Sequence, residues 1–284
     1  MDSVSVRAYG KINLILKVGG KRPDGRHDVL TVMQKVSVFD TVTVTKCEIP
    51  GIAIGCSDPS LATEDNLAYK AASAYFEKAG LDPSVRIYVE KDIPVTAGMA
   101  GGSSDAGATL TALEQLFGAL GFDGIYGIAA TLGADVPFFV YEDKTMLGSG
   151  TGTVLTPFPS FTEDTYGVFV TGVAEKPSTG EMYRRLDEAK GEGSDLSPNA
   201  EGSLRKATEN GDVRGFLSAL ENDFELCNPH AEKVSKELCG LGAQRCVLCG
   251  SGPTVCGIFT DMEMAEKASE ALPYKTFVCK ITGN

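Results

Sequence analysis

Two charged residues lie within apolar stretches of the sequence, where a charged side chain is unexpected. Lys11 lies within "YGKINLIL", and Asp135 lies within "LGADVPFFV" just ahead of a proline. A buried charge is costly unless it has a partner, so each residue is a candidate for chemistry. Each also has a simpler interpretation: a lysine that reaches solvent from an edge strand, and an acid that caps a turn.

A glycine-rich segment, residues 97–109, reads "AGMAGGSSDAGAT" and precedes an apolar helical pattern. Glycine allows positive φ and a close approach to a ligand, while the first amides and the dipole of a helix favour phosphate. The hydroxyls of Ser103 and Ser104 suit phosphate oxygens or a magnesium ion. No Walker or Rossmann pattern is present. The alternative is a serine-capped helix after a flexible loop.

A second glycine turn, "LCGSGPTVCGIF", occupies residues 248–259 near the end of the chain. Apolar residues flank the turn on both sides, which predicts a strand, a tight turn and a second strand. A plain hairpin is the simplest interpretation of this segment.

Hydrophobic periodicity predicts the elements around these motifs. Period-two patterns predict strands at the N-terminus and in "KVSVFDTVTV" and "VRIYVE". We also expect a helix at residues 66–79, a helix from Ser104 and a strand pair around 137–147. In the second half we expect strands at 166–171, 245–249 and 254–259 and a last strand, helices at 179–189, 200–209, 213–222 and 229–239 and one ending at 272, and a charged surface loop at 189–199. This mixture predicts an α+β fold with two lobes that meet near residue 158.

Composition and net charge disfavour several classes of binding partner. The 284 residues carry a net charge of −12, which disfavours nucleic acid and anionic membranes as partners. No apolar run approaches the roughly 20 residues of a membrane span, and the N-terminus does not resemble a signal peptide, so we expect a cytoplasmic protein. Eight cysteines with only two histidines supply a zinc site poorly. We expect Cys246, Cys249 and Cys256 to be buried thiols.

The motifs together resemble those of the GHMP small-molecule kinases. "PVTAGMAGGSSDAGATL" is similar to the nucleotide loop of that superfamily, "GKINLIL" to its first motif and "GSGPTVCGIF" to its third. With "RPDGRHDVLTVMQ", "LGADVPFF" and "NDFE", the match is closest to the family that phosphorylates 4-diphosphocytidyl-2-C-methyl-D-erythritol in the non-mevalonate isoprenoid route. The resemblance implies a ribosomal-protein-S5-like N-terminal lobe (1–157), a ferredoxin-like C-terminal lobe (158–284) and an active site between them.

The resemblance also implies residue roles in phosphoryl transfer from ATP to a hydroxyl group. Asp135 matches the general base, and Lys11 matches the lysine that keeps this carboxylate ionised. Asn13 would orient the acceptor, and Mg²⁺ is expected with ATP, with Ser104 as a candidate ligand. The residues expected to hold the phosphates are Gly98, Ala100, Gly101, Gly102, Ser103 and Ser104.

For the substrate base, the resemblance points to His27 and Tyr183. Gly250 and Ser251 in the third motif are further candidate substrate-binding residues. The family usually has an aromatic residue where "DGRHD" has Arg26. A guanidinium plane can stack on a base, so Arg26 and Tyr183 could form the sandwich. The alternative is a pocket redirected to another substrate.

On the adenosine side, the resemblance makes Asn66 and Lys91 candidate ATP-binding residues. A polar residue at a helix N-terminus and a solvated strand end are the respective alternatives for these two positions.

Three other functions stay open at this point. One is a GHMP kinase for homoserine, mevalonate or a sugar, and another is a non-catalytic ATP-binding regulator of the same fold. The third is a redox or metal module built on the cysteines. The sequence leaves monomer and homodimer equally open.

Overall fold

The computed structural model describes residues 2–95, 97–174, 177–190, 196 and 199–283. The chain forms two compact units that interleave along the sequence. The first unit comprises Met1–Gly10, Val38–Val95 and Ala100–Glu142, and the second comprises Lys11–Ser37, Thr96–Met99 and Asp143–Asn284. The long strands β1 (Ser3–Lys21) and β2 (His27–Lys46) contribute residues to both units. The lobe boundary at residue 158 stays a prediction.

The strands of the first unit follow the order β3-β4-β2-β1. Two of them are β3 (Gly51–Cys56) and β4 (Ser84–Glu90), which pair in parallel. Strand β4 also pairs antiparallel with β2, with Thr41 opposite Glu90. In β4, alternate residues are buried, as the period-two pattern predicts.

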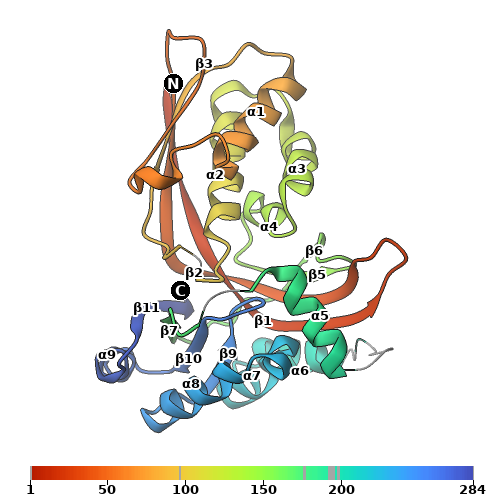
Figure 1. The fold of residues 1–284 in the computed structure, drawn as a ribbon, viewed down its shortest axis with the longest axis vertical. Coiled ribbons are helices and arrows are strands. Elements are labelled where there is room, and N and C mark those ends of the chain that lie inside the picture. The colour runs from red at the N-terminus through yellow and green to blue at the C-terminus, as the bar shows by residue number, and fades with distance from the viewer. Residues whose placement is uncertain (1, 96, 175–176, 191–195, 197–198, 284) are drawn as a thin grey trace. The chain divides into compact units, whose positions relative to one another are not determined.

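The helices of the first unit lie together on one side of these strands (Figure 1). They are α1 (Leu67–Ala79), α2 (Gly101–Phe117), α3 (Gly121–Leu132) and α4 (Val136–Val140), after a 3₁₀ turn at Pro59–Leu61. Their apolar faces and the strands share one core, which includes Val42, Ile87, Leu110 and Ile128. This packing fixes where α2, and with it the glycine segment, begins.

In the second unit, β2 pairs with one short strand, which pairs with a second, and β1 pairs with a third. These are β5 (Thr145–Ser149), β6 (Val154–Pro157) and β8 (Glu221–Asn222). Thr31 of β2 lies opposite Gly148, and Ile15 of β1 lies opposite Glu221. The motif residues on β1 and β2 are thereby fixed in a paired sheet.

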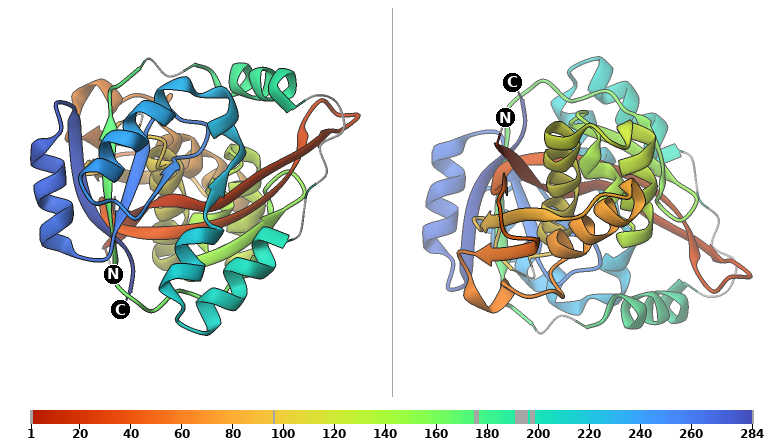
Figure 2. Two further views of the ribbon diagram at one scale, coloured as in Figure 1. Left: turned by 90° about the horizontal axis from the view of Figure 1, so that it is seen from below. Right: turned by 90° about the horizontal axis from the view of Figure 1, so that it is seen from above.

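The second unit also contains an antiparallel sheet with the strand order β11-β7-β10-β9. Its strands are β7 (Thr165–Thr171), β9 (Arg245–Leu248), β10 (Val255–Phe259) and β11 (Lys275–Thr282). The helices are α5 (Thr179–Lys190), α6 (Asn199–Glu209), α7 (Val213–Ala219), α8 (Pro229–Gly240) and α9 (Met262–Ala271), with a 3₁₀ turn at Asp223–Cys227. Figure 2 shows α9, in blue, beside β11. The strand order and the helices between β7 and β9 and between β10 and β11 confirm the ferredoxin-like expectation.

Three expected elements differ in the structure, and one helix was not expected. Helix α2 begins at Gly101, three residues before Ser104. The expected strand pair around 137–147 is wrong in its first part, because Val136–Val140 is helical and only β5 is a strand. Helix α3 was not expected, and the helix expected to reach 222 ends at Ala219. Most of the expected loop at 189–199 lies outside the described residues. No helix among the described residues is both long and apolar enough to cross a membrane.

Candidate active site

The glycine segment leads into α2 through a backbone conformation that non-glycine residues rarely adopt. Ala100, the residue before the helix, has φ 58° and ψ 33°. As the N-cap residue, Ala100 makes no side-chain hydrogen bond to the N-terminus of α2. The first amides of this helix are therefore left to an anionic ligand or to water. A Cβ atom on Gly101 would lie 3.3 Å from the Lys91 Nζ, which explains why glycine begins the helix.

The two serines of this segment differ in their surroundings. Ser104 is buried, and its hydroxyl donates a hydrogen bond to the carbonyl oxygen of Tyr9 at 2.7 Å. Ser103 is half-buried. This contact ties α2 to β1, and because it uses only the proton of the hydroxyl, Ser104 as a magnesium ligand stays a prediction. Among the described residues no cluster of His, Cys, Asp or Glu is suited to hold a metal ion.

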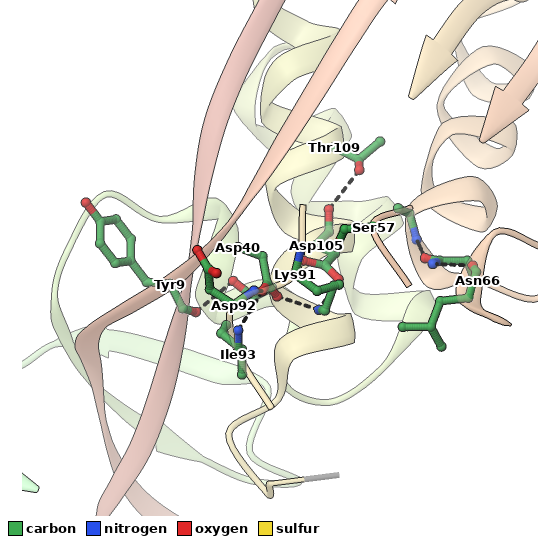
Figure 3. Close-up of polar contacts among 12 residues, drawn as sticks. Tyr9, Asp40, Ser57, Asn66, Lys91, Asp92, Ile93, Asp105 and Thr109 are labelled. Carbon is green, nitrogen blue, oxygen red and sulfur yellow. Dashed lines mark hydrogen bonds and ion pairs between the residues drawn. The ribbon is translucent and has the colours of Figure 1, made fainter. Parts of the chain in front are cut away.

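Lys91 lies between two carboxylates, as Figure 3 shows. Its Nζ donates to Asp105 Oδ2 at 2.7 Å and to Asp40 Oδ2. Asp40 Oδ1 accepts hydrogen bonds from the amides of Asp92 and Ile93. The lysine side chain is 9% exposed, so the alternative of a solvated strand end is wrong. We call Asp40, Lys91 and Asp105 the buried triad.

Burial and charge act against each other in the buried triad. Burial lowers the pKa of Lys91, but the charges and hydrogen bonds of Asp105 and Asp40 outweigh it, and the pKa is raised. Burial raises the pKa of Asp105 to about 7, although Lys91 opposes this shift. Asp105 Oδ1 has no hydrogen-bond partner among the described residues.

Asn66 acts as the N-cap of α1. Its Oδ1 accepts a hydrogen bond from the amide of Ala68 at 2.9 Å, and its Nδ2 donates to the carbonyl oxygen of Leu61 at 2.9 Å (Figure 3). This geometry confirms the helix-terminal interpretation of the residue. A contact of Asn66 with adenosine stays a prediction.

Asp135 directly precedes α4 in the first unit. It is half-buried and occupies the N-cap position, but its side chain makes no capping hydrogen bond to the helix. The turn is closed instead by the amide of Val136 and the carbonyl oxygen of Gly133. Asp135 therefore does not act as a side-chain cap of α4, and its role as a general base stays a prediction.

In the second unit, Lys11 and Asn13 project from the same face of β1. Lys11 Nζ donates to Asn13 Oδ1 at 2.8 Å, and Asn13 Nδ2 donates to the Thr31 hydroxyl at 2.8 Å. Thr31 in turn donates to the carbonyl oxygen of Ile15. The three polar side chains are buried, so Lys11 is not a lysine that reaches solvent from an edge strand. Hydrogen bonds inside the strand pair hold the ammonium group in place.

The third motif approaches the same lysine. Gly250 has φ 56°, and a Cβ atom there would lie 3.5 Å from the Gly98 carbonyl oxygen and 4.0 Å from Lys11 Nζ. Asn222 Nδ2 donates to the carbonyl oxygens of Leu248 and Gly250, each at 2.8 Å. The structure therefore brings Lys11, Gly98 and Gly250 together. Ser251 follows in the turn and is half-buried.

The residues expected to bind the base also lie in the second unit. The rings of His27 and Tyr183 are stacked, with their centroids 4.8 Å apart. His27 Nε2 lies 2.9 Å from Asp187 Oδ1. The Arg26 side chain is 68% exposed and pairs with Asp24. Tyr183 therefore contacts His27, while the Arg26 guanidinium is held by its neighbour in the turn.

Four residues that position the site were not predicted from the sequence. Asp40 is an acid inside an apolar strand, the same signal that marked Lys11, and Asp187 lies one helical turn after Tyr183. Asp105 and Asn222 stood inside quoted motifs without an assigned role. Their positioning roles are visible only in the structure, where Asp105 contacts Lys91 and Asn222 contacts the backbone of Gly250.

Comparison with known proteins agrees with this arrangement. The model of the GHMP kinases N terminal domain matches residues 66–143. A 4-diphosphocytidyl-2-C-methyl-D-erythritol kinase of Moorella thermoacetica is 37% identical over 96% of this chain and 95% of its own length. One of Lachnoclostridium phytofermentans is 37% identical over 94% of this chain and 92% of its own.

Solved structures show the same relationship. A crystal structure of 4-(cytidine 5'-diphospho)-2C-methyl-D-erythritol kinase has a TM-score of 0.81 and 30% identity, covering 99% of this chain and 100% of that one. A homoserine kinase from Cytophaga hutchinsonii, at 18% identity and a TM-score of 0.74, shares the fold and covers 100% of this chain and 96% of that one. The chain therefore belongs to the 4-diphosphocytidyl-2-C-methyl-D-erythritol kinase family of the GHMP kinases.

Proposed function

We propose that the chain transfers the γ-phosphoryl group of ATP to the 2-hydroxyl of 4-diphosphocytidyl-2-C-methyl-D-erythritol, in the non-mevalonate route to isoprenoid precursors. One observation carries the proposal: relatives with that kinase name align over almost the whole chain. The reaction handles small phosphorylated molecules, and we propose that it takes place in the cytoplasm.

The start of α2 is the proposed phosphate site. Phosphoryl transfer needs positioning and neutralisation of charge more than covalent chemistry. The uncapped amides after Ala100 and the dipole of a 17-residue helix supply a local positive potential within a chain of net charge −12. In this proposal Gly98, Gly101, Gly102 and Ser103 lie along the phosphates. Mg²⁺ would supply further neutralisation and would be held mainly by phosphate oxygens and water.

On the adenosine side, Asn66 and Lys91 are the proposed contacts. The Asn66 cap and the buried triad keep both side chains in fixed positions. Each side chain would therefore contact the nucleotide without rearrangement of the helix or strand that carries it.

Asp135 is the proposed general base that takes the proton of the 2-hydroxyl. Lys11 is proposed to keep this carboxylate ionised and to offset charge on the transferred group. The hydrogen bond from Lys11 to Asn13 supports the assignment, because it holds a buried ammonium group in a fixed position on the strand. Asn13, Gly250 and Ser251 are proposed to line the acceptor.

The cytidyl group is proposed to bind at His27 and Tyr183. A ring pair that is already stacked in the second unit supports recognition of a planar base. Arg26 would join this site only if its guanidinium left Asp24.

ADP release with ATP and Mg²⁺ tests the proposal, with the cytidyl compound, homoserine, mevalonate and galactose compared as acceptors. We expect turnover with the cytidyl compound alone. Asp135→Asn should lower kcat by roughly 10²- to 10⁴-fold, since a general base contributes about that factor.

Asp123→Asn is the matched control, because Asp123 is an exposed acid in the first turn of α3. It should keep wild-type turnover. Reaction with another acceptor in place of the cytidyl compound would refute the substrate assignment, and full activity of Asp135→Asn would refute the general base.

A further inference from the structure

Helix α5 holds the ring of His27 at two points. Tyr183 stacks on the imidazole with an interplanar angle of 20°, and Asp187, four residues later, accepts or shares the proton of Nε2 at 2.9 Å. The His27 side chain is 6% exposed, whereas that of Asp187 is 48% exposed. Residues four apart lie on one helix face, so a single helix fixes both the plane and one edge of the imidazole.

The position of α5 is itself fixed at its C-terminal end. Lys190 Nζ donates to the carbonyl oxygen of Val18 at 2.8 Å and also pairs with Asp223. Asp223 in turn accepts a hydrogen bond from the amide of Val18 at 2.7 Å. The helix is thus tied to β1, the strand that leads into the turn before His27, and Asp187 faces the imidazole from a supported position.

A carboxylate opposite one ring nitrogen decides which nitrogen carries the proton. An ionised carboxylate only accepts hydrogen bonds, so a neutral imidazole facing it places its proton on Nε2. Nδ1 then carries a lone pair and is an acceptor. Among the residues that the structure describes, none makes a hydrogen bond to Nδ1 of His27.

We propose that Asp187 is a specificity-determining positioning residue, which fixes His27 as an Nδ1 acceptor and so selects a base with an exocyclic amino group. This inference rests on the proposed function, since it assigns the choice between pyrimidines to the same site. Cytosine presents a 4-amino donor, where uracil presents a carbonyl oxygen. An Nδ1 lone pair accepts from the amino group of cytosine and repels the oxygen of uracil.

Imidazole ¹⁵N NMR tests the tautomer directly, because the chain has only two histidines. His230→Gln assigns the two signals. At an alkaline pH where imidazoles are neutral, His27 should carry its proton on Nε2, and exchange of this proton with water should be slow. In Asp187→Ala the Nε2 proton should exchange faster, and the Nδ1-protonated tautomer should appear. Asp187→Glu keeps a carboxylate, which only accepts hydrogen bonds, and should preserve the wild-type tautomer.

Kinetics test the consequence for specificity. The ratio of kcat/KM for the cytidyl substrate to that for its uridyl counterpart should fall about tenfold in Asp187→Ala, the size of one lost hydrogen bond. Asp187→Glu should restore most of the ratio. Glu188→Ala is the control, because Glu188 is an exposed acid of the same helix that pairs with Arg184.

Three results would overturn the inference. They are an Nδ1-protonated His27 in the wild type, an unchanged tautomer and exchange rate in Asp187→Ala, and an equal loss for both substrates that leaves the ratio unchanged. The last result would mean that Asp187 only holds α5 in place. A wild type that does not phosphorylate the cytidyl compound would refute the proposed function and the specificity role together, while the NMR result still decides whether Asp187 sets the tautomer.

Discussion

Lys11 and Lys91 show two ways of accommodating a buried ammonium group. Within its own unit Lys11 donates to the neutral amide oxygen of Asn13, whereas Lys91 is enclosed by the carboxylates of Asp40 and Asp105. One ammonium group balances only one of the two carboxylates, which agrees with the raised pKa of Asp105.

Asp105 predicts a specific dependence of stability on pH. Burial raises its pKa from 3.8 to about 7, so between these values the folded protein keeps a proton that the unfolded chain has lost. The free energy of unfolding contributed by this group therefore falls as the pH rises from about 4 to about 7, by up to about 4 kcal/mol. Asp105→Asn should remove this part of the slope, as measured by urea unfolding at a series of pH values.

Asp92→Asn is the matched control for this experiment. Asp92 is an exposed acid whose backbone amide, and not its side chain, contacts the buried triad. Its variant should keep the wild-type slope between pH 4 and 7. If Asp105→Asn and the wild type lose stability in parallel over that range, Asp105 is ionised throughout and the proposed proton is absent.

At the scale of elements, the start of α2 combines backbone strain with an uncapped N-terminus. Ala100 adopts a left-handed conformation that costs an L-residue about 1–2 kcal/mol. Glycine avoids this strain but gains freedom in the unfolded chain worth about 0.4–1 kcal/mol. Ala100→Gly should therefore raise the free energy of unfolding by roughly 0.5–1 kcal/mol, as measured by urea titration.

Ala74→Gly provides the comparison, because it lies in the interior of α1 with ordinary helical geometry. It should lower stability by about 1 kcal/mol. An Ala100→Gly variant as destabilised as this control would show that the left-handed turn carries no strain.

The elements that sequence patterns missed are short or stabilised by packing. A run such as "VPFFV" is apolar at every position, so periodicity cannot distinguish a buried strand from a buried helix. Helix α2 begins with two glycines, which are poor helix formers. Its packing compensates: a Cβ atom on Gly107 would lie only 2.6 Å from that of Phe139. Local helix propensity therefore does not predict this part of the structure, because contact between α2 and α4 stabilises it.

At the scale of the whole molecule, the sequence was informative wherever chemistry is local to a motif. Lys11, Asp135 and the glycine segment stand out within a few residues of sequence. The partners that position the site come from distant segments, since Asp187 is 160 residues from His27 and Lys91 is 51 residues from Asp40. Such pairs depend on the fold, and one sequence contains no pattern that would reveal them.

The eight cysteines allow a last prediction about the whole chain. Cys239 is exposed, Cys47 and Cys227 are half-buried, and the other five are buried. Thiolate is the reactive form, and burial raises the pKa of Cys249 to about 12 despite the nearby Lys11. A thiol reagent should therefore label Cys239 first in the native protein, and the five buried thiols only as fast as the chain unfolds.

In guanidinium, without reductant, all eight thiols should react. The sulfur atoms of Cys239 and Cys246 lie 3.8 Å apart, so oxidation would be expected to form a disulfide between these two residues. A disulfide there would lower the number of labelled thiols in the wild type by two. In a Cys239→Ser, Cys246→Ser double variant, all the remaining thiols would then react. It would also revive a redox role that the buried, high-pKa thiols argue against.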